Sequence, residues 1–419
     1  MRLVRRWPLL RNRDYMLFWS GAALSELGSQ ISSVAYPLLI LTLTGSAAKA
    51  GVVGLAKWLP LAIFAIPAGA LADRVDRKRL MITSDAVRML GAASIVVALW
   101  LGRPSFFQVV VVAFLDGGLF MTSHICERGA LPQLVATEQV QDAVAQNEAR
   151  YFGASIIGPP LGGVLFAASR ALPFLADTVS FLCSMATTAL TRPRFQTAKD
   201  RVTSVRAGLT EGFSWLRRQP FFRTTSMLFA GANPVYTGLY LLAILLAKHH
   251  GASSAAVGAM FAIVGAGGVL GAFAAAPARR RLSARLVIAG EEWLLLLCVL
   301  LLLIARSALV IGLLVAAAEF STPIGNSLVA GSRVAATPDR LQGRVAAVSA
   351  TVGMSLAWLG PLGVGFAFQR AGPTTTILIV VGWTLALAIA ASLAPALRSG
   401  PPVPALTEQG WRQGVSSGT

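Results

Sequence analysis

The chain has 419 residues, of which 55% are hydrophobic and only 13% are charged. Soluble domains carry about 25% charged residues, so this composition leaves too little polar surface to cover a water-soluble globule. The net charge is +18, from 36 Lys and Arg against 18 Asp and Glu. Such an excess of bases is typical of nucleic-acid binding or, in a membrane protein, of cytoplasmic loops. The composition therefore excludes a soluble globular protein and leaves two explanations of the charge.

Apolar stretches of about 20 residues, long enough to cross the roughly 30 Å hydrocarbon core of a bilayer, recur along the chain. The first of them follows a basic N-terminus, but it is too long for the hydrophobic segment of a signal peptide, and we expect it to be retained. An all-α integral membrane protein with twelve transmembrane helices is predicted. The predicted spans are residues 15–43, 49–72, 80–101, 106–127, 143–168, 173–191, 223–247, 254–277, 286–305, 307–330, 344–368 and 373–397.

A longer polar segment separates the sixth and seventh predicted spans. Its apolar residues recur at helical spacing and predict an amphipathic helix on the membrane surface. These residues are Val205, Leu209, Phe213 and Leu216. The polar segment at the C-terminus is expected to be disordered. The chain is thus divided into an N-terminal six-helix bundle, a cytoplasmic linker, a C-terminal six-helix bundle and a cytoplasmic tail, at residues 1–192, 193–222, 223–398 and 399–419.

The basic residues are distributed unevenly between the two ends of the predicted spans. With the N-terminus in the cytoplasm, 27 of the 36 Lys and Arg fall in cytoplasmic segments, six on the opposite side and three within spans. This asymmetry follows the positive-inside rule for an even number of spans with both termini in the cytoplasm. The basicity therefore reports orientation in the membrane, and nucleic acid is not an expected partner.

An internal repeat appears when the sequence is shifted by 202 residues. The matched positions are Gly69 with Gly271, Gly158 with Gly360, Pro159 with Pro361, Gly163 with Gly365 and Phe166 with Phe368. Several matches at a single offset predict two pseudo-symmetric halves related about an axis along the membrane normal. A substrate site is then expected near the bilayer midplane, between the halves.

The segment between the second and third predicted spans has the sequence GALADRVDRKR, from Gly69 to Arg79. Its glycine permits close helix packing, and its bases lie where lipid headgroups favour them. It resembles the loop signature of the major facilitator superfamily, G-x-L-A-D-R-x-G-R-K-R, with Asp76 in place of the usual glycine. The resemblance implies the two-bundle fold of that superfamily and a cytoplasmic latch between the halves. The latch residues would be Gly69, Asp73, Arg74, Arg77, Lys78 and Arg79.

Charged residues at adjoining helix ends are candidates to pair with this latch. They are Asp85, Arg88, Glu127 and Arg128. The second half keeps the bases of the motif but has Ala275 at the position equivalent to Asp73. An asymmetric latch is therefore expected.

The fifth predicted span contains the sequence GPPLGG. Prolines bend a membrane helix, and glycines let a neighbour approach closely, so ordinary packing is one explanation of this segment. It also resembles the superfamily's antiporter motif, G-P-x-x-G-G, which is typical of exporters. The motif residues would be Gly158, Pro159, Gly162 and Gly163.

Two further segments, LPQLVATEQVQDAVAQNE and ATPDRLQGRV, resemble loops of a bacterial efflux branch that includes macrolide and siderophore exporters. Drug–proton antiporters often carry the motif R-x-x-Q-G in the fourth span. This chain has Ala113 where the arginine would stand. Proton coupling through that arginine is therefore excluded.

Acidic residues lie near the middle of three predicted spans, at Glu26, Asp116 and Glu319. A charge at the bilayer centre costs roughly 2.5 to 3.5 kcal/mol on insertion scales, so each acid is a functional candidate. Shifted by 202 residues, Asp116 falls one position from Glu319. Apolar surroundings disfavour the charged carboxylate, which suits a proton carrier. Alternatively the acids hold helices together, with Lys57 as a candidate partner.

Aromatic and amide residues of the predicted spans are candidates to line a central cavity. They are Tyr36, Phe114, Asn233, Tyr236, Tyr240, Asn326 and Trp358. Asn233, Tyr236 and Tyr240 share one helical face. Cys126, Cys183 and Cys298 lie inside predicted spans, and neither a metal site nor a cofactor is expected.

These patterns predict a secondary active transporter that exports a small amphipathic compound, such as a drug, an antibiotic or a siderophore, in exchange for protons. Proton-linked uptake and lysolipid flipping by the same fold are alternatives, and a polytopic enzyme acting on lipid-linked substrates is a remote one. The sequence contains no Walker-type loop, which argues against ATP as the energy source. The longest loop, residues 192–222, contains no nucleophile–base set, so no enzyme activity is expected. The expected partners are a small-molecule substrate, protons and membrane lipids, and the protein is expected to act as a monomer in the cytoplasmic membrane.

Overall fold

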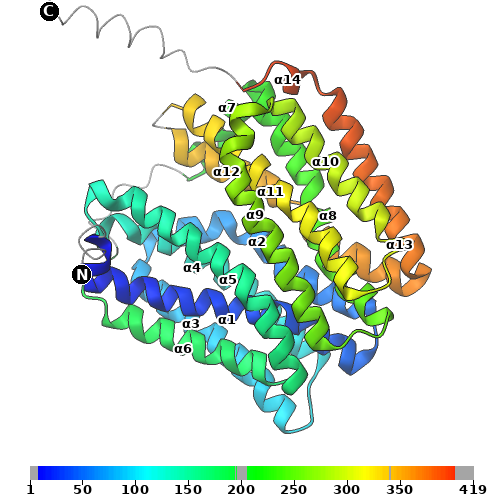
Figure 1. The fold of residues 1–419 in the computed structure, drawn as a ribbon. Coiled ribbons are helices and arrows are strands. Elements are labelled where there is room, and N and C mark those ends of the chain that lie inside the picture. The colour runs from blue at the N-terminus through cyan, green and yellow to red at the C-terminus, as the bar shows by residue number, and fades with distance from the viewer. Residues whose placement is uncertain (1–7, 194, 196–204, 339–340, 402–419) are drawn as a thin grey trace, which may run out of the picture.

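The structure is a computed structural model that describes residues 8–193, 195, 205–338 and 341–401. Within these ranges the chain is helical and contains no β-strand. The predicted tail beyond residue 401 and most of the predicted linker before Val205 lie outside the described residues. The first and second halves of the chain form two groups of long helices that lie side by side (Figure 1).

The first half begins with a short 3₁₀ helix, η1 (Pro8–Arg11), and contains six long helices. They are α1 (Arg13–Thr44), α2 (Ala47–Arg74), α3 (Arg77–Trp100), α4 (Phe106–Leu134), α5 (Val140–Ala168) and α6 (Leu172–Leu190), with a 3₁₀ turn, η2 (Thr137–Gln139), before α5. Helix α1 packs against α5 and α6, and α4 packs against α2 and α3. Asn12 caps α1, since its side chain accepts a hydrogen bond from the Tyr15 backbone N–H.

The second half follows the connecting helix α7 (Val205–Arg218). Its helices are α8 (Pro220–His249), α9 (Ser254–Arg281), α10 (Ala284–Leu301), α11 (Ala308–Ala336), α12 (Gln342–Met354), α13 (Leu359–Leu393) and α14 (Pro395–Arg398). Helix α9 packs along α11, and α13 packs against α8 and α10. The arrangement of the first half is thus repeated by helices about 200 residues further along the chain.

Ten segments of the described chain are long and apolar enough to cross a membrane. One of them, Gln342–Leu393, is twice the length of a single crossing, and it reverses at Gly372, whose φ of 78° is accessible to glycine. Helix α10 has 18 residues but carries Glu291 and Glu292. Counting both legs of the long segment and α10, the predicted twelve membrane-spanning helices are present, and the all-α membrane fold is confirmed.

A helix break divides the eleventh span between α12 and α13. Pro361 has no backbone N–H and crowds the carbonyl four residues earlier, that of Ala357. The Thr237 hydroxyl on α8 donates to this carbonyl at 2.6 Å, and the Asn233 amide donates to the Gly353 carbonyl at 2.9 Å. Backbone that leaves the helical pattern inside a membrane protein is tolerated where such partners satisfy it.

Glycines of the internal repeat pack the two halves together. A Cβ atom at Gly163 on α5 would collide with the backbone of Gly258 on α9, and one at Gly365 on α13 would meet the backbone of Gly51 on α2. All four glycines lie near the end of the bundle at which α1 is connected to α2 and α5 to α6. We call this end of the bundle the far end. The opposite end, where α1 begins and α2 joins α3, is called the basic end.

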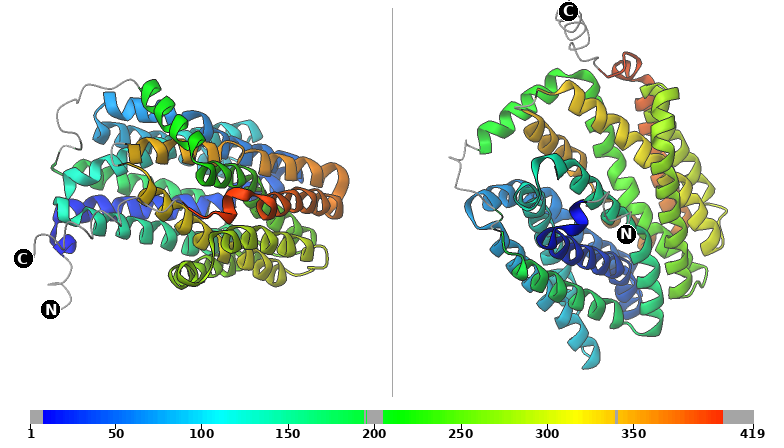
Figure 2. Two further views of the ribbon diagram at one scale, coloured as in Figure 1. Left: turned by 90° about the horizontal axis from the view of Figure 1, so that it is seen from above. Right: turned by 60° about the vertical axis from the view of Figure 1, so that its left-hand side comes forward.

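The apolar core has different extents at the two ends. The largest cluster includes fully buried residues of both halves, such as Leu39 on α1 and Leu242 on α8. At the basic end there are two separate clusters, one around Phe18 in the first half and one around Phe222 in the second. The described halves therefore share one core toward the far end and have separate cores at the basic end. Figure 2 shows the helices of the two halves in two further views.

Helix α7 coincides with the predicted amphipathic segment and packs against α12. Leu216 is buried in the second-half cluster, whereas Phe213 is half exposed. Glu211 and Arg344 form an ion pair that connects α7 to α12. The side chains of Val205 and Leu209 lie outside the described residues. This helix therefore uses part of its apolar face for contact with the second half.

We predict that Gly163→Ala destabilises the protein because the added methyl group has no room against the α9 backbone. Overpacking of this kind costs about 1 to 3 kcal/mol. The matched control is Gly153→Ala on the same helix, where a Cβ atom has no neighbour within 4 Å. Thermal unfolding of the detergent-purified protein measures both, and equal melting temperatures would contradict the proposed packing.

Candidate functional site

A cluster of charged side chains lies inside the first half, and Asp116 on α4 is at its centre. The Arg88 Nε on α3 donates to Asp116 Oδ1 at 2.8 Å, and the Lys57 Nζ on α2 lies 3.5 Å from Asp116 Oδ2. Arg88 and Asp116 are both 4% exposed. Each carboxylate oxygen of Asp116 therefore has a basic partner from another helix.

Arg88 also connects α3 to two further helices. Its Nη2 donates to the Ser29 hydroxyl on α1 at 2.9 Å, and its guanidinium lies 4.2 Å from the centroid of the Phe181 ring on α6. Asp85, one turn away on α3, lies 3.9 Å from Arg88 Nη1 and accepts a hydrogen bond from Ser184 on α6 at 2.7 Å. A buried guanidinium needs partners for its five N–H donors, and this one binds helices α1, α3, α4 and α6 into one body.

A third buried acid near this cluster, Asp177 on α6, was not among the sequence candidates. It is 1% exposed and lies beside Gly28, near the middle of α1. Counting residues from the end of the predicted span does not identify Asp177. It follows the start of α6 by only five residues, which suggests a position close to the membrane surface. Helix α1 continues 16 residues beyond Gly28, to Thr44, so Asp177 lies opposite the middle of α1. The sequence signal that could have identified Asp177 is its position as an acidic residue inside a predicted span.

The other two predicted acids, Glu26 and Glu319, lie in different halves. Glu26 on α1 is 7% exposed and accepts a hydrogen bond from Gln30 at 3.1 Å. Glu319 on α11 is hydrogen-bonded to the Tyr240 hydroxyl on α8. Both carboxylates are close enough to the Tyr151 hydroxyl on α5 to interact with it electrostatically. Tyr151 and Tyr240 are also close enough to influence each other electrostatically, so acids and tyrosines of both halves lie near one another.

The second half contains two more buried acids, next to each other on α10. The Glu291 Oε1 accepts a hydrogen bond from Tyr236 on α8 at 3.3 Å, while its Oε2 has no hydrogen-bond partner. Glu292 is 3% exposed and also has an unpartnered oxygen. Within the described part of the chain no ion pair involves Glu291, Glu292 or Glu319. Glu291 and Glu319 are therefore matched with tyrosines, whereas Asp116 is matched with bases.

The residues of the predicted latch lie at the basic end, where α2 joins α3. The Arg77 Nη1 donates to the Gly129 carbonyl on α4 at 2.8 Å, and the Lys78 Nζ donates to the Thr191 carbonyl after α6 at 2.5 Å. Asp76, the departure from the family pattern, caps α3 by accepting from the Arg79 backbone N–H at 3.0 Å. These contacts join the loop to its own half.

The remaining latch residues make fewer described contacts. The side chains of Arg74 and Arg79 are exposed, and the helical position of Gly69 has open space beside it. Asp73 belongs to α2, and its side chain lies outside the described residues.

The candidate latch partners have other partners in the structure. Asp85 and Arg88 belong to the buried cluster around Asp116. Glu127 on α4 pairs with the buried Arg150 on α5 at 2.5 Å. Arg128 lies 3.9 Å from Glu148, and both side chains are more than half exposed. Of the four expected partners, none has a described ion pair with the loop residues.

The GPPLGG segment lies on α5 where it crosses α1. Side chains at Gly158 and Gly162 would collide with Gln30 and with the Ile31 backbone, respectively. Pro159, also in this segment, is buried. Together with the contact of Gly163 to α9, the segment packs α5 tightly against its own half and against the other half.

The remaining cavity candidates are spread over several environments. Tyr36 is 2% exposed and packs edge-on against Phe174, with the Lys57 Nζ 5.1 Å from its ring centroid. Phe114 packs edge-on against Phe64. The Trp358 Nε1 donates to the Ser355 carbonyl at 2.9 Å in the break between α12 and α13, and Asn326 on α11 is exposed. Tyr36 thus belongs to the buried cluster rather than to an open surface.

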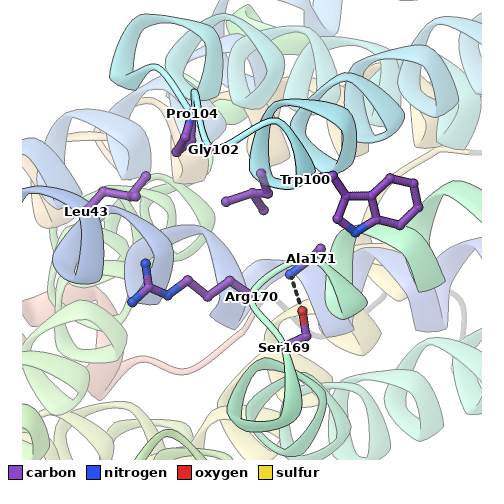
Figure 3. A pocket seen from close by; sticks show the side chains of 8 residues that line it. Leu43, Trp100, Gly102, Pro104, Ser169, Arg170 and Ala171 are labelled. Carbon is purple, nitrogen blue, oxygen red and sulfur yellow. Dashed lines mark hydrogen bonds between the residues drawn. The ribbon is translucent and has the colours of Figure 1, made fainter.

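A pocket of about 370 Å³ lies at the far end of the first half. Figure 3 shows Leu43, Trp100 and Arg170 around it, on α1, on α3 and in the turn between α5 and α6. Its lining contains no acid and no residue of the second half. This pocket is therefore separate from the acid–tyrosine group between the halves.

Comparison with known proteins agrees with this architecture. Residues 5–412 match the family model described as transmembrane secretion effector, and the chain belongs to that family of the major facilitator superfamily. It is therefore a multi-pass membrane protein that belongs to a family of transporters rather than of enzymes.

Among curated relatives, the chain is 30% identical over 247 residues to the multidrug efflux pump Tap of Mycolicibacterium fortuitum, covering 57% of this chain and 58% of that protein. It is 27% identical over 227 residues to macrolide efflux protein A of Streptococcus pyogenes, covering 52% and 54%. The matched regions thus cover less than two thirds of the length of these relatives.

Among solved structures, a bacterial homologue of the human lysosomal transporter Spinster, in an inward-facing and unoccupied conformation, matches with a TM-score of 0.71 at 15% identity. The match covers 94% of this chain and 99% of that one. A bacterial homologue of the iron transporter ferroportin, in an inward-facing state, matches with a TM-score of 0.69 at 16% identity, covering 91% and 98%. These likenesses confirm the predicted fold of the superfamily.

We predict that Arg88→Gln strongly destabilises the first half, because Asp116 and Asp85 lose their buried guanidinium partner. Removing one member of a buried ion pair costs about 3 to 5 kcal/mol. Arg128→Gln, which breaks an exposed pair, is the control and is expected to change stability by at most about 1 kcal/mol. Thermal unfolding in detergent compares the two, and similar melting temperatures would show that the buried network does not support the fold.

Proposed function

We propose that this protein exports small amphipathic compounds across the cytoplasmic membrane in exchange for protons. The observation that supports this proposal most directly is the pairing of acids with tyrosines between the halves. Glu26 and Glu319 come from opposite halves and both interact with Tyr151. Carboxyl groups in such a position can take up and release protons while substrate occupies the same space.

Alternating access would proceed by rocking of the two halves about their shared core. The cores are separate at the basic end, so this end opens without loss of packing within either half. At the far end, closure depends on backbone contacts at Gly163 and Gly365. With both termini in the cytoplasm, the basic end would be the one that opens toward the cytoplasm.

The energy for export would come from the proton gradient. An inward gradient of one pH unit supplies about 1.4 kcal/mol per proton, and a potential of 100 mV adds about 2.3 kcal/mol per net charge moved. Glu26 and Glu319 are the proposed carriers, because neither has a described ion-pair partner. Asp116 differs, since two bases bind it and favour its charged form.

The latch is proposed to act in the opposite state. Arg74 and Arg79 are exposed at the basic end and are available to bind the second half when that end closes. Arg77 and Lys78 are already bound to carbonyls of their own half and would hold the loop in position. A single chain supplies both halves of the pathway, so a monomer in contact with membrane lipids is the proposed functional unit.

We predict that Glu26→Gln and Glu319→Gln each abolish gradient-driven drug accumulation in inverted membrane vesicles. An amide cannot release a proton in this pH range, so substrate movement loses its driving force. Accumulation of a macrolide and of a panel of other antibiotics is measured after an imposed pH gradient, with and without an ionophore.

The control for this assay is Glu138→Gln, an exposed acid in the 3₁₀ turn before α5, which is expected to retain full activity. Undiminished accumulation by both carrier variants would remove these acids from the coupling mechanism. Accumulation only in right-side-out vesicles would favour uptake, and movement of labelled lysolipid would favour a flippase.

The proposed orientation makes a separate prediction. Cysteines introduced at Lys49 and Arg170, at the far end, should react with a membrane-impermeant thiol reagent added to intact cells. A cysteine at Arg79, at the basic end, should react only after the membrane is permeabilised. The cause is the excess of bases at that end, which favours retention in the cytoplasm. The reverse pattern of labelling would contradict the orientation.

A further inference from the structure

The buried charge cluster of the first half contains more acids than bases. Its acids are Asp85, Asp116 and Asp177, and its bases are Lys57 and Arg88. Asp116 binds both bases, and Asp85 lies beside Arg88 and accepts from Ser184. No described ion pair includes Asp177. If all five groups were ionised, the cluster would hold one uncompensated negative charge in an apolar interior, which is costly.

The surroundings of Asp177 leave part of its carboxyl group unsatisfied. Its Oδ1 has no hydrogen-bond partner although the residue is 99% buried. Helix α1 approaches so closely at Gly28 that a Cβ atom there would lie 2.8 Å from this oxygen. There is therefore no room for a methyl group beside Oδ1, and close helix packing rather than a polar partner surrounds it.

The Ser32 hydroxyl on α1 is a polar neighbour of the Asp177 carboxyl group. This hydroxyl donates to the Ser29 carbonyl at 3.2 Å, which uses its one hydrogen. A carboxylic acid at Asp177 can donate to the Ser32 oxygen, whereas a carboxylate would have to compete for that hydrogen. The Ser32 hydroxyl, which can donate or accept, is therefore compatible with both forms of the carboxyl group and allows the protonated one.

We propose that Asp177 is a proton-binding group of this transporter, and that Asp116 is the permanently ionised partner of Arg88 and Lys57. This proposal rests on the proposed proton-coupled transport and adds a site to it. The step is a simple proton transfer: an O–H bond of a hydronium ion breaks as the Asp177 O–H bond forms, leaving water, and the reverse occurs on release. No co-reactant is needed.

The titratable and charged groups of the neighbouring helices determine the effect of protonating Asp177. The titratable and charged groups around Asp177 are Tyr36 on α1, Lys57 on α2, Asp85 and Arg88 on α3, and Asp116 on α4. Helix α5 adjoins α6 at their connecting turn, and its last titratable residue is Tyr151. An ionised Asp177 therefore competes with Asp116 for the same two bases.

Lys57 is the member of the cluster that connects it to the other half. Its side chain is 24% exposed, and it lies on α2, the helix whose Gly51 and Gly54 pack against Gly365 and Pro361 of α13. Release of the proton from Asp177 draws positive charge toward α6 and weakens the bond of Lys57 to Asp116. The proton is thereby coupled to the helix that holds the halves together at the far end.

Infrared difference spectroscopy of the purified full-length protein tests this proposal without substrate or gradient. The C=O stretch of protonated carboxyl groups is recorded in reconstituted membranes as the pH is raised. We expect Asp177→Asn to lose one titrating carboxyl band that persists in the double variant Glu26→Gln/Glu319→Gln. Asp177→Glu should restore a titrating band. An unchanged set of bands in Asp177→Asn would overturn the proposal.

A second variant covers the case in which Asp177→Asn does not fold. Ser32→Ala leaves the carboxyl group in place but removes the hydroxyl beside it. We expect the Asp177 band to move in frequency in this variant, and an unmoved band would overturn the proposal. The spectra and the vesicle assay test the two proposals separately. If Asp177→Asn loses the band but the unmodified protein accumulates no drug, only the proposed export is refuted. If the unmodified protein accumulates drug but Asp177→Asn has unaltered bands, only the Asp177 site is refuted.

Discussion

A guanidinium group in the interior of a membrane protein needs partners on every side, and Arg88 finds them on four helices. It binds Asp116 and Ser29, stacks over Phe181 and lies beside Asp85. Water cannot replace any of these partners in a packed core, so helices α1, α3, α4 and α6 keep one relative position. This constraint makes the first half a rigid body, which is what movement of one half against the other requires.

The two halves share their packing but not their charges. The repeat retains glycine at 163 and 365, and both positions bring a helix of one half against the other half. The buried charged residues are not repeated in this way between the halves. The first half neutralises Asp116 with two bases, whereas Glu319 and Glu291 in the second half are bound by tyrosine hydroxyls. Packing glycines thus maintain the common scaffold, and the unequal acids give the halves different chemistry.

The architecture follows largely from the sequence because each spanning helix satisfies its own backbone hydrogen bonds. Length and hydropathy therefore locate the spans one at a time, and the internal offset locates the halves. The exceptions have local causes. The eleventh span breaks before Pro361, where α8 supplies hydroxyl and amide partners, and α7 turns part of its apolar face toward α12. Both exceptions depend on a neighbouring element, which a single helical pattern does not contain.

The sequence by itself determined the membrane-spanning class, the two related halves and the presence of costly acids such as Glu26, Asp116 and Glu319. These are properties of one helix or of a simple count of charges. Only the tertiary structure decided which acids have partners. Lys57 and Arg88 reach Asp116 from other helices, and Asp177 lies deep because it packs against Gly28 in the middle of α1. The rotation and axial offset of packed helices determine such pairings, and neither is encoded in the residue count along one span.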